Sequence, residues 1–373
     1  MKQESSMLHL IVVTVFVGIL LTCSIFYFTN LLVEGESTVA PSCYDGSVFE
    51  RTDPLSAFQR TVYQHDSSLA LIREYQYRLF GIVSGNTVIA GEDDFLFPVW
   101  DEAHHYSYVD DFTGKSAFTA RQSAAILAEL ERRRTAYEAL GAEYLLVVLP
   151  NAQTVYSECM PAYYGPISEQ TRLRMLNEYL YDHGYIYFVD LTDELREAKS
   201  DGLLYNNTES SLNALGFYHV YRAIYQRFSD DVLANTDLIQ RKSLHFYQHR
   251  TTGKSVAREA GLSDVVYNRT VSLSNSTKLN YRYVYNAGFA ATTILLPFYV
   301  SSENTASPEL LLQFSNTWDR LQIEPYFSNT FGMVTYQTDL EEDPGTFAAA
   351  APKVVIQFIY ENELSLLLPE EMQ

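Results

Sequence analysis

The stretch Leu204-Tyr-Asn-Asn-Thr-Glu-Ser-Ser-Leu-Asn-Ala-Leu-Gly-Phe-Tyr218 is the most informative part of this 373-residue sequence. Its first half is polar, and the apolar residues from Ala214 to Phe228 predict a helix directly after it. The short side chains of Asn207 and Thr208 are predicted to bond to nearby backbone groups in a turn or helix cap. Glu209 is interpreted as an exposed loop carboxylate. Ser211 cannot act as a general base near pH 7, because a hydroxyl lacks the basicity of an imidazole.

The same stretch has the frame of a catalytic motif without its catalytic residues. It resembles the Tyr-x-x-Thr and Asp-x-His-Trp-Asn-x-x-Gly segments (Asp-His-His-Trp in one branch) of the SGNH-hydrolase-like proteins that include the alginate O-acetyltransferases. The residues that match, called the frame residues below, are Tyr205, Thr208, Asn213 and Gly216. The resemblance places the family's Asp on Glu209, its His on Ser211 and its Trp on Leu212. It therefore implies an inherited scaffold whose acyl-transfer chemistry has been lost.

The position of the family's nucleophilic serine is also altered in this chain. In the family it is the Ser of Gly-Asp-Ser-Phe, which follows an apolar strand and precedes a helix. The matching segment here is Glu309-Leu-Leu-Leu-Gln-Phe-Ser-Asn-Thr-Trp318. Placing Phe314 on the Gly puts Asn316 on the nucleophile, whereas a one-residue slip puts Ser315 there. Even then, a serine without a base keeps its high pKa and is a weak nucleophile.

Three further segments carry the resemblance in the family's order between residues 85 and 368. Ile89 to Phe97 is similar to Val-x-Gly-Lys-Asp-Gly-Trp-Leu-Phe, and Val147 to Tyr156 is similar to Val-x-Pro-x-Lys-x-x-Val-Tyr, with Ala152 at the Lys. Lys353 to Leu364 is similar to Asp-Val-Val-Ile-x-x-x-x-Glu-Arg-x-Leu. The resemblance implies an SGNH-hydrolase-like α/β fold, in which the substrate-binding positions are Asn151, Tyr156 and Asn213. A place in the core is the alternative for Tyr156.

The apolar pattern independently predicts a parallel sheet flanked by helices, because strand and helix alternate along the chain. Residues 240 to 300 differ, since their Thr, Ser, Tyr and Val content and local alternation favour an antiparallel β insertion or edge. The predicted helices are 57–80, 117–140, 169–182 and 214–228, and the predicted strands of the sheet are 144–149, 185–189, 310–313, 332–336 and 354–358.

The composition limits the possible partners. The net charge of −20 argues against nucleic acid and makes a neutral glycan a better partner than an anionic polymer. The sequence shows no zinc-ligand spacing and no phosphate loop, so we predict neither a metal nor a cofactor. Cys43 and Cys159 are the cysteines outside the first apolar run, and a disulfide between them is left open.

The first apolar run predicts a membrane anchor. Leu8 to Thr29 contains no Asp, Glu, Lys or Arg and is long enough to span a bilayer. With Lys2 before it and Glu34 after it, the run predicts a cytoplasmic segment 1–7, a transmembrane anchor 8–29, a linker and helix 30–84, and an extracytoplasmic domain 85–373 at the cell membrane. A cleaved signal peptide or a lipid attachment at Cys23 is the alternative.

Two classes of function remain open. The first is a membrane-anchored SGNH-like protein without catalytic activity, which acts in cell-envelope or exopolysaccharide modification by binding a glycan or envelope proteins. The second is an active polysaccharide O-acetyltransferase or acetylesterase that uses Ser315 and a replacement base. Asp101, His104 and His105 are the residues that could supply this base, although a His pair on a polar loop favours a solvated surface. The loss of three catalytic positions favours the first class.

Overall fold

The computed structural model describes residues 66–83, 85, 87–228, 237–277, 281–284, 298–302, 308–315, 317–337 and 352–372. The predicted anchor 8–29, Cys43 and Asn316 lie outside these residues. The chain divides into two compact units, Met1–Arg73 and Glu74–Gln373, and the division falls within helix α3 (Asp66–Phe80). Within the described ranges, no helix is long and apolar enough to cross a membrane.

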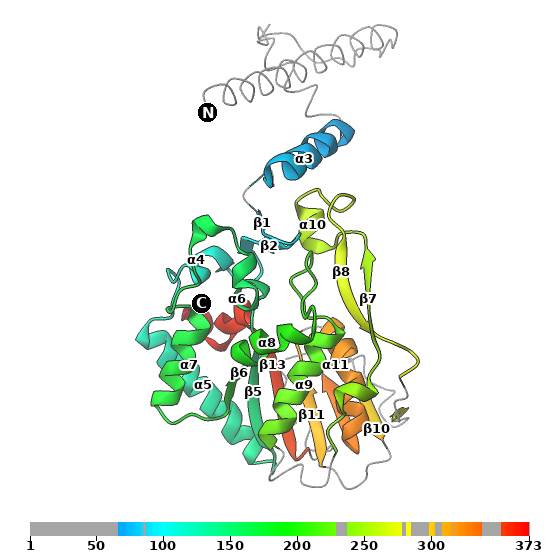
Figure 1. Cartoon of the computed structure of the whole chain (residues 1–373). Coiled ribbons are helices and arrows are strands. Elements are labelled where there is room, and N and C mark those ends of the chain that lie inside the picture. Colours follow the sequence, from blue (N-terminus) through cyan, green and yellow to red (C-terminus); the bar gives the residue numbers. More distant parts are fainter. Residues whose placement is uncertain are drawn as a thin grey trace, which may run out of the picture. The chain divides into compact units, whose positions relative to one another are not determined.

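A seven-stranded sheet with the order β6-β5-β13-β11-β12-β10-β9 forms the centre of the second unit (Figure 1). Its five parallel strands are β6 (Phe188–Asp190), β5 (Glu143–Leu149), β13 (Val354–Tyr360), β11 (Glu309–Gln313) and β12 (Met333–Gln337). The predicted parallel sheet is confirmed. Six of the seven residues of β5 are buried, as expected for a strand covered on both faces.

Both faces of the sheet are covered by helices. Alternate residues of β5 point to opposite faces, so Leu145, Val147 and Leu149 join one core and Tyr144, Leu146 and Val148 the other. Helices α8 (Thr192–Ala198), α9 (Ala214–Phe228) and α11 (Thr317–Thr330) contribute to the first core. The second core is built with α5 (Ala120–Glu138), α7 (Arg172–Asp182) and the 3-10 segment η7 (Glu361–Leu367).

The β-rich segment forms two separate structures. Strand β10 (Phe298–Ser302) pairs antiparallel with β12, and β9 (Tyr281–Val284) pairs antiparallel with β10, so this part extends the edge of the main sheet. Strands β7 (Phe246–Thr251) and β8 (Asn268–Leu273) form an antiparallel ribbon of their own, with α10 (Ser255–Glu259) between them in the chain.

Capping residues account for the later starts of two predicted helices, since Thr119 caps α5 and Thr171 caps α7. Helix α5 begins later than predicted, because Thr119 caps it in a reciprocal capping box with Gln122. Gly141, with a φ of +79°, follows its end in the left-handed conformation that favours glycine. The short elements before and after β5 are β1 (Val88–Ala90), β2 (Leu96–Pro98), β3 (Trp100–Asp101), β4 (Tyr106–Ser107), α4 (Tyr108–Phe112) and α6 (Ala152–Val155).

Candidate functional site

The loop from Leu204 to Asn213, called the motif loop below, lies against the carboxyl end of strand β5. The Tyr205 hydroxyl donates a hydrogen bond of 2.5 Å to the carbonyl oxygen of Pro150, which directly follows β5. Tyr205 and Leu212 also form an isolated antiparallel bridge that closes the loop. Ligand sites of open α/β sheets form at this end of the strands, so the loop is in the position that a site requires.

Two frame residues shape the start of helix α9. The Asn213 side-chain oxygen accepts hydrogen bonds from the backbone N–H groups of Leu215 (2.9 Å) and Gly216 (3.1 Å), and its amide donates to the Leu203 carbonyl (2.7 Å). Gly216 allows α9 to approach the loop, because a Cβ atom there would lie 2.5 Å from the carbonyl oxygen of Leu204. Asn213 is buried and bonded within the protein, and its predicted role in substrate binding stays a prediction.

The side chain of Asn207 makes long-range contacts instead of the predicted local turn. Its amide donates to the carbonyl oxygens of Asp94 (2.8 Å) and Tyr267 (3.2 Å), and its oxygen accepts from the backbone N–H of Arg269 (2.6 Å). The local interpretation was wrong, because partners distant in sequence satisfy this buried side chain.

The predicted local bond was also wrong for Thr208. Its hydroxyl donates to the Asn268 side-chain oxygen (2.8 Å) and accepts from the backbone N–H of Lys254 (3.0 Å). Asn207 and Thr208 therefore hold the motif loop against the ribbon β7–β8 and the segment that leads into α10.

Glu209 and Ser211, the positions of the family's Asp and His, share one partner. The Asn206 amide donates to the Ser211 hydroxyl at 3.0 Å and to the Glu209 carboxylate at 3.4 Å. Glu209 is half-buried rather than exposed, and burial raises the pKa of its carboxyl against the attraction of Lys254 and Arg258. The amide that bonds the Ser211 hydroxyl is not a base, and the Glu209 carboxylate is the basic group of this pair.

Ser315 follows strand β11 at the same edge of the sheet and bonds to a different carboxylate. Its side chain hydrogen-bonds Glu363 of η7, which also accepts the backbone N–H of Tyr360 at 2.9 Å. Burial raises the pKa of the Glu363 carboxyl, although these two bonds oppose the shift. The bonds of Ser315 and Ser211 thus lead to different partners, and a common cleft for the predicted catalytic positions stays a prediction.

An Asp–His pair that the sequence interpretation placed on a solvated surface lies beside Glu363. Nδ1 of His104 is 2.7 Å from Oδ2 of Asp101, and the Asn362 amide donates to the same oxygen at 2.7 Å. The His104 side chain is only 22% exposed, so the solvated interpretation was wrong for this residue. Burial favours a higher pKa for Asp101, but the bonds from His104 and Asn362 outweigh burial and lower the pKa. His105 is exposed.

A buried acidic network lies beneath this pair. One oxygen of Glu361 accepts from the Asn151 backbone N–H at 2.7 Å and from the Thr154 hydroxyl at 2.6 Å. The Asn151 amide continues to the Tyr106 hydroxyl (3.0 Å), which donates to Asp111 (2.6 Å). Burial, together with the charge of Asp111, raises the pKa of Glu361 to about 8. Asn151 is buried and bonded within this network, and its predicted contact with substrate stays a prediction.

Tyr156 belongs to the core beside the motif loop. It is 7% exposed, its ring packs against that of Phe95, and its hydroxyl accepts the backbone N–H of Leu204 at 3.0 Å. Burial raises the pKa of this phenol to about 12, so it is a neutral group at ordinary pH. Its predicted role in substrate binding also stays a prediction.

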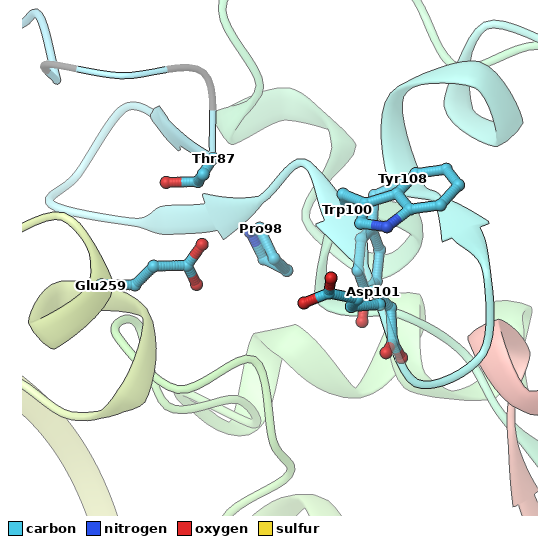
Figure 2. Close-up of a pocket in the computed structure, with 7 residues that line it drawn as sticks. Thr87, Pro98, Trp100, Asp101, Tyr108 and Glu259 are labelled. Carbon is cyan, nitrogen blue, oxygen red and sulfur yellow. The ribbon is translucent and has the colours of Figure 1, made fainter.

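A cavity of about 470 Å³ opens beside Asp101 of the Asp–His pair, and Figure 2 shows Asp101 among its lining residues. Its wall comes from the β1–β4 segment on one side and from α10 on the other, and the lining residues are Thr87, Pro98, Trp100, Asp101, Glu102, Tyr108 and Glu259. The Asp101 side chain therefore belongs both to the cavity and to the group around Glu363. The sequence motifs did not indicate this cavity, and the only local signal in the sequence is Trp100 directly before Asp101 and Glu102.

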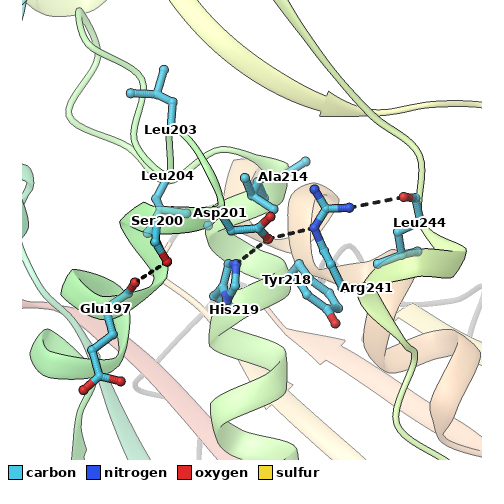
Figure 3. Close-up of polar contacts among 12 residues, drawn as sticks. Glu197, Ser200, Asp201, Leu203, Leu204, Ala214, Tyr218, His219, Arg241 and Leu244 are labelled. Carbon is cyan, nitrogen blue, oxygen red and sulfur yellow. Dashed lines mark hydrogen bonds and ion pairs between the residues drawn. The ribbon is translucent and has the colours of Figure 1, made fainter.

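A second Asp–His pair is structural. Oδ2 of Asp201 accepts from Nε2 of His219 (3.0 Å) and from Nε of Arg241 (2.7 Å), as Figure 3 shows. The serine of this group, Ser200, donates to the Glu197 carbonyl (3.0 Å) and not to the histidine. Burial lowers the pKa of His219 despite the bond to Asp201. The pair connects α9 to the chain before β7, and it has no nucleophile.

Two further features of the described residues concern metal ligands and the thiol of Cys159. Among them, no three His, Cys, Asp or Glu side chains converge on a point that could hold a metal ion. Cys159 is buried as a free thiol whose pKa burial raises to about 11, so the thiolate that reacts or binds metal is disfavoured.

Comparison with known proteins identifies the fold. No protein-family model matches the sequence, and no curated protein is similar to it. Among solved structures, PatB1 of Bacillus cereus, determined with a sulfonyl adduct, matches with a TM-score of 0.51 at 11% identity over 76% of this chain and 96% of that one.

Two further solved structures give similar values. The O-acetyltransferase domain of Pseudomonas putida AlgJ has a TM-score of 0.48 at 16% identity, over 77% of this chain and 95% of that one. A DHHW family protein from Eubacterium siraeum has a TM-score of 0.49 at 12% identity, over 77% and 96%. The fold that the motif resemblance implied is confirmed: this chain has the SGNH-hydrolase-like fold of the PatB1 structure.

Proposed function

We propose that this protein is a membrane-anchored, extracytoplasmic member of the SGNH-like proteins that acts in the modification of an envelope polysaccharide. In this proposal it binds a glycan or an envelope protein and transfers no acyl group. One observation carries the proposal: the amide of Asn206 bonds both Glu209 and Ser211, where the family has a carboxylate and an imidazole. Neither the Ser211 hydroxyl nor the Asn206 amide can replace the imidazole as a proton acceptor.

The pattern of retained and lost residues supports this proposal. The frame residues all have structural tasks: Tyr205 and Thr208 position the motif loop, while Asn213 and Gly216 start helix α9. Ser211 stands where the motif has its imidazole, and Leu212 and Ala152 differ from the motif as well, whereas Glu209 keeps a carboxylate. A chain that keeps the scaffold of a site but not its reacting groups is suited to binding, because pocket shape depends on the scaffold.

The location is proposed from the sequence. The apolar run Leu8 to Thr29 would anchor the chain, and the charge asymmetry around it favours an extracytoplasmic domain. The similarity to AlgJ and PatB1 concerns the fold, and an envelope polysaccharide is the partner that we propose on the basis of this similarity and the strongly negative charge.

Two measurements on the purified full chain test the proposal. We expect no hydrolysis of p-nitrophenyl acetate or of an acetylated polysaccharide above the buffer rate, and we expect retention of the chain on immobilised envelope polysaccharide. The variant Ser315→Ala should behave like the wild type in both assays. Wild-type turnover that this substitution abolishes would show that the protein is an enzyme.

A second candidate function rests on the Asp101–His104 pair. Asn362 bonds this pair and the adjacent Glu363 bonds Ser315, so η7 brings an imidazole close to the partner of a possible nucleophile. An acetylesterase using Ser315 and this pair would lose its activity in both Ser315→Ala and His104→Gln. His105→Gln, at the exposed neighbouring residue, is the matched control and should leave such activity unchanged.

A further inference from the structure

The motif resemblance gives no role to the cavity shown in Figure 2. Its volume of about 470 Å³ lies within the range of small-molecule sites. Glu259 projects from α10, and Asp101 projects from β3 on the opposite wall, so their carboxylates face the space between the two elements.

The wall of the cavity is negatively charged. Three of its seven lining residues are acidic, namely Asp101, Glu102 and Glu259, and the lining includes no Lys or Arg. The pKa of Tyr108 reflects this negative charge. Burial raises the pKa of its phenol, and the charges of Asp101, Glu363, Glu361 and Glu259 raise it further. A cation in this cavity would gain from these carboxylates, whereas an anion would be repelled.

The carboxylates are too dispersed for a metal ion but suit a larger cation. No group of three acidic, His or Cys side chains in the described residues converges as metal ligands do. Trp100 instead offers an indole that is 49% exposed at the cavity. An aromatic face beside carboxylates can stack on a sugar ring and attract an ammonium group on that ring.

We infer that this cavity binds a sugar chain carrying free amino groups, that is, a de-N-acetylated hexosamine polymer. The inference rests on the proposed function, because it assumes that the protein binds an envelope glycan, and it names the chemical class. Trp100 would stack on a sugar ring, and Glu102 and Glu259 would pair with its ammonium group. A neutral N-acetylated ring would keep the stacking contact but lose the ion pairs.

Chitosan and chitin oligosaccharides of equal length separate these contributions, because they differ only in N-acetylation. By titration calorimetry on the full chain at low salt, we expect chitosan hexamer to bind about tenfold or more tightly than chitin hexamer, and added salt to remove most of this preference. Glu259→Gln should reduce the preference, and Trp100→Ala should weaken the binding of both sugars. Glu143→Gln removes an exposed carboxylate at the start of β5 and is the matched control.

Other outcomes would overturn either the inferred amino-sugar binding or the proposed function. Equal binding of the two oligosaccharides, unchanged in Glu259→Gln, would overturn the inference and leave the proposed glycan binding intact. Binding of poly-lysine that Glu259→Gln weakens, without binding of chitosan, would also overturn it and would favour a basic protein as the partner. Ester hydrolysis that depends on Ser315 would refute the proposed function whatever the cavity binds.

Discussion

The substitution Glu361→Gln tests the buried acidic network. Glu361 is fully buried, and burial together with the charge of Asp111 raises its pKa from 4.5 to about 8. Below pH 4.5 the carboxyl holds its proton in both the folded and the unfolded chain, and it contributes no pH dependence. Between 4.5 and about 8 the unfolded chain releases the proton while the folded chain keeps it, so the free energy of unfolding falls as the pH rises.

The magnitude follows from the shift. Each pH unit in this window corresponds to about 1.4 kcal/mol, so at pH 7 the loss amounts to about 3 kcal/mol. Glutamine cannot ionise, and its carbonyl oxygen can keep the bonds that the Glu361 carboxyl accepts from Asn151 and Thr154. The difference in stability between Glu361→Gln and wild type should therefore grow as the pH rises from about 5 to about 8.

Urea unfolding followed by circular dichroism at several pH values measures this difference. The informative quantity is the slope of the unfolding free energy with pH. The second oxygen of Glu361 has no bonding partner among the described residues, so an amide nitrogen in its place adds a penalty that is the same at every pH. Glu143→Gln, at an exposed carboxylate, should follow the wild-type curve. Parallel curves for wild type and Glu361→Gln would refute the assignment of a protonated carboxyl at neutral pH.

Three further outcomes are expected. Asn213→Ala removes the N-cap of α9 and the bond to the Leu203 carbonyl, and it should lower the free energy of unfolding by about 1 kcal/mol or more in the same urea experiment. Gly216→Ala places a Cβ atom 2.5 Å from the Leu204 carbonyl oxygen, and thermal unfolding should show a loss of about 1–3 kcal/mol, so a neutral effect would contradict the close approach. Protease added to intact cells should remove the domain, and protection until lysis would reverse the proposed topology.

The sequence predicts the fold well because apolar runs are local signals. The buried runs of β5, β11 and β13 identified three parallel strands, and Gly141 marked the end of α5 because its left-handed conformation favours glycine. Errors at helix starts arose from caps that shift the first turn by a few residues.

The site was less predictable, because its contacts join distant parts of the chain. Asn362 bonds Asp101 across 261 residues, and no periodicity or motif relates these two positions. Asn207 looked like a turn residue because short amides bond locally in most turns, yet its partners are Asp94, Tyr267 and Arg269. The position of Asn316 relative to the motif loop stays a prediction, since it lies outside the described residues.

The place of β13 in the sheet has a consequence for how the domain is made. β13 follows every other strand of the sheet in the chain, yet it lies between β5 and β11. Until Val354 to Tyr360 has left the ribosome, these two neighbours lack their shared partner and expose unpaired backbone groups. A chain stopped before Val354 would present two open strand edges, so we expect such fragments to aggregate or to be degraded, and the intact domain to fold only after synthesis has passed this strand.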